Sequence, residues 1–186
     1  MQEIISAFTL PNLVFNIFCS LIASFIFIFT LLYFLKPKFE IVPYIAKNDS
    51  PFDDTKDICY SFKIINKSFF GAYDIQAKAN YYAIRQGENG IINKIYSKIE
   101  LKTEKINFVP QFKLFKEKYG DNCIQFLTYE NLSAKMDGGT NHIQFQVTAR
   151  HSLSGLNNIF TYEFVNKSTI VEGRFKEGNY KEVVKC

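Results

Sequence analysis

A run of 23 residues, from Leu13 to Leu35, constrains this chain more than any other feature. The run contains no charged side chain, and as a helix rising about 1.5 Å per residue it would be about 34 Å long. That length slightly exceeds the ~30 Å hydrocarbon core of a bilayer. The sequence therefore predicts one transmembrane helix over residues 13–35, after a short N-terminal flank (1–12) and before a juxtamembrane linker (36–38).

A cleaved leader is the first alternative to a retained anchor. A signal peptide would need a basic start, a shorter apolar run and small residues at its cleavage site. Glu3 is the only charged side chain before the run, and Lys36-Pro37-Lys38 follows where cleavage would occur. A lipoprotein signal is also disfavoured, because Ile17 and Phe18 precede Cys19. We expect the anchor to be retained.

Basic residues near the ends of the run predict its orientation. Lys36, Lys38 and Lys47 follow the run, whereas no Lys or Arg precedes it. Because basic flanks stay on the cytoplasmic side, we expect a single-pass protein of the cell (inner) membrane. The short N-terminus would lie outside and the larger C-terminal part in the cytoplasm.

Polar and small residues recur along one side of the run. The set comprises Asn12, Asn16, Ser20, Ala23 and Ser24, with Cys19 beside it. Helices in lipid associate through close approach at small residues and through hydrogen bonds between polar side chains. The stripe therefore predicts a helix–helix contact. The alternative is that each Ser bonds to the carbonyl one turn back and that Asn12 lies in the interface.

The remaining residues alternate between apolar and polar side chains, which is typical of β-strands. The roughly 148 residues are enough for one domain with its own core. We expect strands at 39–46, 58–66, 72–84, 91–101, 123–129, 143–149, 159–165 and 168–175. Short strands separated by turns predict an all-β fold over 39–175: an antiparallel β-sandwich, immunoglobulin-like, or a small barrel. Residues 176–186 are expected to form a C-terminal tail.

Several local signals refine this expectation. Pro43 cannot donate to a ladder, so the first strand should lie at a sheet edge. Asn89-Gly90 predicts a hairpin that pairs 72–84 with 91–101. Residues 103–122 are left irregular, with 106–109 a possible short strand and 112–119 fitting a helical turn or a strand. Residues 130–141 are expected to form a loop.

The four cysteines, Cys19, Cys59, Cys123 and Cys186, do not suggest a zinc site, because no two have metal-binding spacing. A disulfide between Cys59 and Cys123 is disfavoured by facing. Cys59 alternates with Ser61 and Lys63, so it should point away from the core. We expect reduced thiols.

No motif for hydrolysis, nucleotide binding or metalloprotease chemistry occurs, so we expect no enzyme, no cofactor and no metal. The net charge of +4 is spread among mixed signs, which argues against nucleic-acid binding. Acidic residues gather at Asp49, Asp53, Asp54 and Asp57, but without the spacing of a calcium loop. A possible ligand contact comprises Arg150, His151, Ser152 and Ser154, on a loop expected to be exposed; the same residues could simply build a turn.

These observations allow two functional hypotheses. In the first, a membrane-anchored, non-enzymatic β-sandwich binds a protein or small ligand, while its helix self-associates or pairs with a partner transmembrane protein. In the second, ligand binding clusters the anchors, which then form a pore or perturb the bilayer. The lipid bilayer is the expected partner in both.

Overall fold

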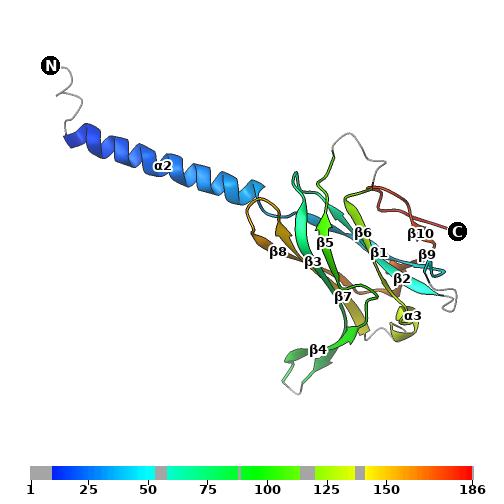
Figure 1. Cartoon of the computed structure of the whole chain (residues 1–186). Coiled ribbons are helices and arrows are strands. Elements are labelled where there is room, and N and C mark those ends of the chain that lie inside the picture. Colours follow the sequence, from blue (N-terminus) through cyan, green and yellow to red (C-terminus); the bar gives the residue numbers. More distant parts are fainter. Residues whose placement is uncertain (1–9, 53–57, 88, 114–119, 137–140, 186) are drawn as a thin grey trace. The chain divides into compact units, whose positions relative to one another are not determined.

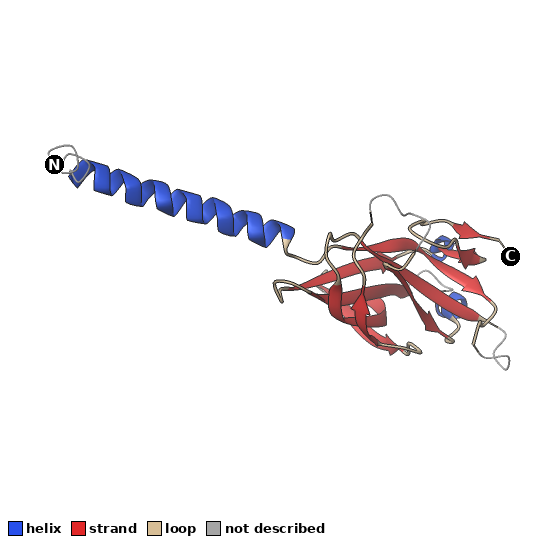
Figure 2. Ribbon diagram, turned by 45° about the horizontal axis from the view of Figure 1, so that its top comes forward, coloured by secondary structure: helices blue, strands red, loops and turns tan. Residues whose placement is uncertain are grey.

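The computed structural model describes residues 10–52, 58–87, 89–113, 120–136 and 141–185 (Figure 1). By its internal contacts the chain divides into two units, residues 1–36 and 37–186, which we describe separately. We call the second the β unit. Figure 2 distinguishes the long helix of the first unit from the strands of the second.

The helix of the first unit, α2, covers Leu10–Phe34. The most apolar stretch of its segment Asn12–Phe34 has a mean hydropathy of 2.5 and is not buried, and the segment is long and apolar enough to cross a membrane. The predicted helix is therefore confirmed, with its ends shifted. It ends before Lys36-Pro37, where the proline ring disfavours helical backbone in the preceding residue.

The β unit consists mainly of two sheets. Sheet A has the order β6 (Cys123–Thr128), β2 (Cys59–Asn66), β1 (Phe39–Asn48), β9 (Ile170–Glu172). Sheet B has the order β4 (Ile92–Ile99), β3 (Ala72–Gln86), β7 (Asn141–His151), β8 (Asn157–Phe164), and β5 (Lys105–Val109) also pairs with β3. A two-stranded sheet joins β10 (Arg174–Phe175) to β11 (Val183–Val184). The short helices are α3 (Leu132–Lys135) and η2 (Lys167–Thr169).

The inner faces of sheets A and B share one core. Phe62 of β2 stacks on Phe145 of β7, with ring centroids 4.6 Å apart and an interplanar angle of 3°. Phe126 of β6 and Phe164 of β8 also contact this pair, and all four rings are fully buried. Two sheets packed face to face make a sandwich. The predicted all-β fold class is confirmed.

Alternation predicted most strand faces correctly. Along β7 the side chains of Ile143, Phe145, Val147 and Ala149 are buried and the residues between them are not. The hairpin at Asn89-Gly90 is also confirmed, because β3 and β4 pair antiparallel from Ala79–Ile99 to Gln86–Ile92. Gly90 has φ +74°, which a glycine adopts without strain.

Two strands depart from the expected pattern. In β3 the register shifts between Tyr73 and Gln76, and Asp74 has φ +49°. This bulge turns Tyr73 outward, although alternation placed it on the inner face with Ile75. The expectation that β1 is an edge strand holds for its first part, where β2 is its described neighbour in sheet A, and was wrong for its last part. Pro43 lies in a register irregularity between Ile41 and Ile45, and beyond it β1 pairs in parallel with β9.

A second, smaller core covers the outer face of sheet A. Val42 and Ala46 of β1 and Ile65 of β2 pack against Phe175, with Cys123 and Val183 beside them. The expectation that residues 176–186 form a tail was therefore wrong, because this segment folds back as a loop and β11, which pairs with β10. As a result, every residue of β2 is buried, including the three expected to face solvent: Cys59, Ser61 and Lys63.

Two stretches left without regular structure contain short elements. Residues 105–109 form β5, which pairs with the first part of β3. Residues 132–135 form the single-turn helix α3, capped by the side chain of Asn131. Both are too short to show periodicity in the sequence. Most of the ambiguous stretch 112–119 lies outside the described residues, as do residues 137–140.

Candidate functional site

The polar stripe of α2 is exposed along the helix. Ser20 Oγ donates to the Asn16 carbonyl and Ser24 Oγ to the Ser20 carbonyl, both at 2.8 Å. Cys19 and Ala23 lie beside them, exposed. The Asn16 side-chain amide forms no hydrogen bond with any residue that the structure describes. Within one chain the serines thus satisfy their own donors, and Asn16 retains an amide that can donate and accept.

Of the four residues predicted to contact a ligand, only His151 and Ser154 interact with each other. His151 is buried, with 1% of its surface exposed, so the expectation that it lies on an exposed loop was wrong. Its Nδ1 accepts the backbone N–H groups of Leu153 and Ser154, both at 3.3 Å, and lies 3.3 Å from Ser154 Oγ. Burial lowers the pKa of His151. The ring is therefore neutral, protonated on Nε2, and holds the turn closed.

Arg150 and Ser152 do not join that arrangement. Arg150 lies on the exposed side of β7, where its guanidinium pairs with Asp74 at 3.4 Å. Ser152 takes part through its backbone, whose N–H donates to the Gly71 carbonyl at 3.1 Å. The geometry supports the turn interpretation for His151 and Ser154, and ligand contact through this loop stays a prediction.

A buried lysine, which the sequence analysis did not single out, organises the C-terminal segment. Lys63 Nζ donates to the carbonyls of Lys176, Gly178 and Tyr180 at 2.7, 2.8 and 2.8 Å. Burial lowers the pKa of Lys63, but three acceptors match the three N–H groups of an ammonium. Strand alternation gave no signal for this site, because it marks Lys63 as an outward residue without showing what covers it.

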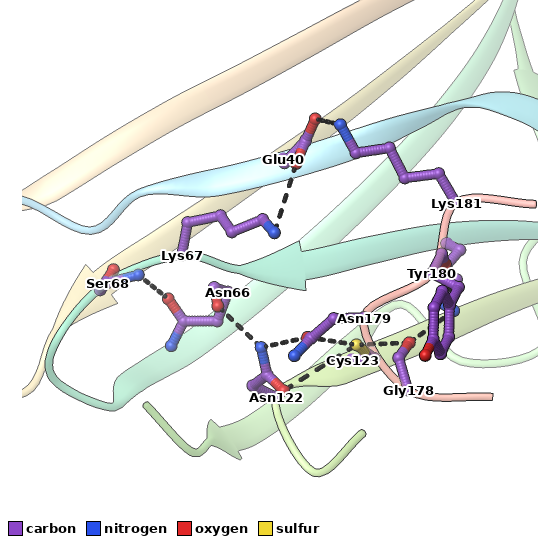
Figure 3. Close-up of polar contacts among 11 residues, drawn as sticks. Glu40, Asn66, Lys67, Ser68, Asn122, Cys123, Gly178, Asn179, Tyr180 and Lys181 are labelled. Carbon is purple, nitrogen blue, oxygen red and sulfur yellow. Dashed lines mark hydrogen bonds and ion pairs between the residues drawn. The ribbon is translucent and has the colours of Figure 1, made fainter. Parts of the chain in front are cut away.

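Further polar contacts extend from this lysine (Figure 3). Cys123 Sγ lies 3.1 Å from the Gly178 carbonyl, and Asn122 Nδ2 donates to Asn179 Oδ1 at 2.7 Å. Asn122 Nδ2 also reaches the Asn66 carbonyl at 3.0 Å. On the exposed side, Glu40 pairs with both Lys67 and Lys181. The network fixes the loop between β10 and β11 against sheet A and has the character of a structural support.

The thiols in the described part of the chain are free. Cys123 of β6 pairs with Ile65 of β2. Cys59 is the first residue of β2, six residues before Ile65. At about 3.3 Å per residue their separation is roughly 20 Å, far beyond disulfide reach. Burial raises the pKa of both thiols, so neither is activated as a nucleophile.

An open pocket of about 390 Å³ lies at the end of β1. It is lined by Lys47, Asn48, Asp49, Ile58, Glu172, Gly173 and Lys185. The hydrogen bond between Lys47 and Glu172 raises the pKa of the lysine and lowers that of the glutamate, so each neutralises the other. The pocket could admit a small polar molecule, but it contains no pair of groups arranged for acid–base or nucleophilic chemistry.

The described residues contain no cluster of three metal-ligating side chains. Of the acidic loop, Asp49 is described, whereas Asp53, Asp54 and Asp57 lie outside the described residues. The expected absence of a calcium site therefore stays a prediction for that loop.

Comparisons with known proteins add little. No family model matches the chain, and no curated protein matches it. One similar solved structure is that of a Bordetella pertussis protein named as ApaA, with a TM-score of 0.34 and 8% sequence identity. The alignment covers 69% of this chain and 92% of that one. A similarity at this level carries no argument about function.

Proposed function

We propose that this chain is a single-pass membrane protein whose β unit serves as a non-enzymatic interaction module. The observation that carries the proposal is α2. Its 23-residue apolar segment has the length of a bilayer core, and none of its most apolar stretch is buried. A helix that exposes apolar side chains over most of its surface is stable in lipid and unfavourable in water.

Association of the anchors is the second part of the proposal. Because Ser20 and Ser24 donate within their own helix, their contribution to a contact is their small size, which allows close backbone approach. Asn16 contributes its side-chain amide, which would gain an interhelical hydrogen bond worth roughly 0.6 to 2 kcal/mol. A symmetric pair of helices would place two such amides together.

A transmembrane association assay in bacterial membranes tests this contact. Asn16→Leu and Ser20→Leu should each weaken association, the first by losing the hydrogen bond and the second by separating the backbones. Phe25→Leu, a substitution outside the stripe, is the matched control and should have little effect. If the unchanged chain shows no self-association and captures no partner helix, the stripe is tolerated polarity and the association part of the proposal fails.

Orientation requires a different probe from the native thiols. Cys59 is buried, so it would resist labelling on either side of the membrane. We propose a cytoplasmic β unit and test it with Ile92→Cys, at a position 63% exposed, in a chain with Cys19, Cys186 and the half-buried Cys123 replaced by serine. An impermeant thiol reagent should label this cysteine only after permeabilisation. Labelling of intact cells would reverse the orientation.

The Asn16 amide is also the observation that favours the effector hypothesis. A ring of several anchors could bring these amides together around a polar path. Expression in bacteria separates the two functions. Loss of membrane potential that disappears in Asn16→Leu would favour the effector, and unchanged potential would favour the interaction module.

A further inference from the structure

One end of the β unit gathers the chain's first residues in this unit and three loops. We call it the proximal end and define it as residues 37–38, 66–73, 108–112 and 150–158. Lys38 is held on both sides: its N–H donates to Ser68 Oγ and its carbonyl accepts from Lys67 N–H, each at 2.7 Å. Asn158 Nδ2 donates to the Pro37 carbonyl at 3.3 Å. The chain therefore joins the β unit at this end.

Buried polar groups brace the loops of the proximal end. Asn66, which is fully buried, donates from Nδ2 to the carbonyls of Phe70 and Pro110 and accepts the Ser68 N–H at Oδ1. Phe112 N–H donates to the Ser68 carbonyl at 2.9 Å. A Cβ on Gly71 would lie 2.5 Å from the Phe108 ring, so glycine permits that close packing. These contacts hold the loops in one arrangement.

The braced loops and the strand ends beside them expose large apolar side chains. Their exposed fractions are 57% for Phe69, 37% for Phe70, 46% for Tyr73, 45% for Phe108 and 66% for Leu153. Tyr73 packs on Phe108, and Phe70 packs on the buried His151 ring, so the aromatic rings are supported from behind. Clustered apolar exposure on a rigid surface is typical of a contact with a partner or a membrane.

The connection to α2 identifies the occupant. Five Cα steps separate Phe34, the last residue of α2, from Phe39, the first of β1, and they span at most about 18 Å. With α2 inserted in a bilayer, as proposed above, the proximal end must lie near the lipid surface. Lys36 and Lys38, between α2 and β1, add positive charge that suits anionic headgroups. The covalent chain thus brings the bilayer to this end, whereas it brings no soluble partner there.

We propose that the proximal end docks on the lipid surface, with Phe69, Phe70, Tyr73, Phe108 and Leu153 inserted among the headgroups and upper acyl chains. Tyr73 suits that region because its ring is apolar and its hydroxyl is polar, and the Phe and Leu side chains gain by leaving water. The inference rests on the proposed membrane anchor. In this arrangement Leu153, in the turn of residues 150–154, contacts the membrane, and the buried His151 ring holds that turn in place.

Single tryptophans in the full-length chain test the inference, because the natural sequence contains none. Phe69→Trp and Leu153→Trp report on the proximal end. Ile92→Trp is the matched control: its position is 63% exposed, but it pairs with the far end of β3, about 46 Å from Ala72. Phe25→Trp reports on the anchor. Each variant is placed in vesicles of neutral and anionic lipids, with or without phospholipids brominated in the upper acyl chains.

We expect brominated lipid to quench the Phe69→Trp and Leu153→Trp variants strongly, with emission at shorter wavelengths than in detergent. The Ile92→Trp control should stay unquenched. Lipids brominated near the bilayer centre should quench the Phe25→Trp variant, which would show that the anchor is inserted.

Two results would contradict the reasoning, and they are distinguishable. If the anchor tryptophan is quenched but both proximal-end tryptophans are not, this inference alone is overturned. The same holds if the emission of these tryptophans shifts without quenching, because a protein would then cover them instead of lipid. An unquenched anchor tryptophan would instead overturn the proposed membrane anchor.

Discussion

Replacing Lys63 with methionine tests how the C-terminal segment is held on sheet A. Methionine keeps an unbranched apolar side chain of similar length and removes both the charge and the three N–H donors. The carbonyls of Lys176, Gly178 and Tyr180 would lose their shared partner. The apolar contacts of Phe175 with Val42, Ala46 and Ile65 would remain.

The expected loss follows from two opposing contributions. Hydrogen bonds to a charged group stabilise by about 1.5 to 3 kcal/mol each, so three amount to about 4.5 to 9 kcal/mol. Burying the ammonium costs several kcal/mol, consistent with the direction in which burial moves the pKa of Lys63. The difference predicts that Lys63→Met lowers the free energy of unfolding by about 2 to 4 kcal/mol.

Urea unfolding of the full-length chain in detergent, followed by near-ultraviolet circular dichroism, measures this loss. Hydrogen exchange should show lost protection first in residues 174–184. Lys181→Met is the matched control, because Lys181 forms a surface ion pair with Glu40 that contributes at most about 1 kcal/mol. If Lys63→Met unfolds like the control and residues 174–184 stay protected, the apolar contacts alone hold the segment and the reasoning is refuted.

Three further predictions concern the β unit. Phe145→Ala should lower the free energy of unfolding by about 3 to 5 kcal/mol in urea titrations, because it empties the stacked centre of the core, whereas Gln144→Ala on the opposite face should stay within about 0.5 kcal/mol. Burial holds the pKa of His151 below its ordinary 6.5, so the unfolded chain binds the extra proton and stability should fall as the pH drops below about 6.5; His151→Asn, whose Oδ1 can replace Nδ1 as acceptor, should flatten that pH dependence and His142→Asn should not. Gly173→Ala should destabilise β10–β11, seen as faster hydrogen exchange there, because φ is +127° and the new Cβ would lie 2.2 Å from the Val184 carbonyl oxygen; unchanged exchange would contradict this.

The elements that could be predicted are those in which a sequence pattern repeats over many residues and every residue of the pattern has the same kind of surroundings. The uncharged run of α2 and the alternation of β7 each average over many residues, so one exception does not alter the interpretation. Asn89-Gly90 predicted its hairpin because few other residues adopt the backbone that such a turn needs.

The errors share a different cause, since each depends on contacts between segments far apart in the sequence. Lys63 belongs to an outward-facing set by alternation and is buried only because residues 176–180 return to cover it. Pro43 predicted an edge along all of β1, but residues 170–172 return to pair with the part of β1 that follows it. The proximal end could not be found from the sequence either, because Phe69, Phe108 and Leu153 come from three separate parts of the chain.

The second core of the β unit also affects when the protein can finish folding during its synthesis. Val42, Ala46 and Ile65 leave the ribosome early, soon after the apolar helix, yet Phe175 and Val183 complete their burial. Until residues 174–184 have emerged, the outer face of sheet A is an apolar surface on a growing chain. That face is therefore where we expect a chaperone to bind the nascent protein, and its closure is a late step in biogenesis.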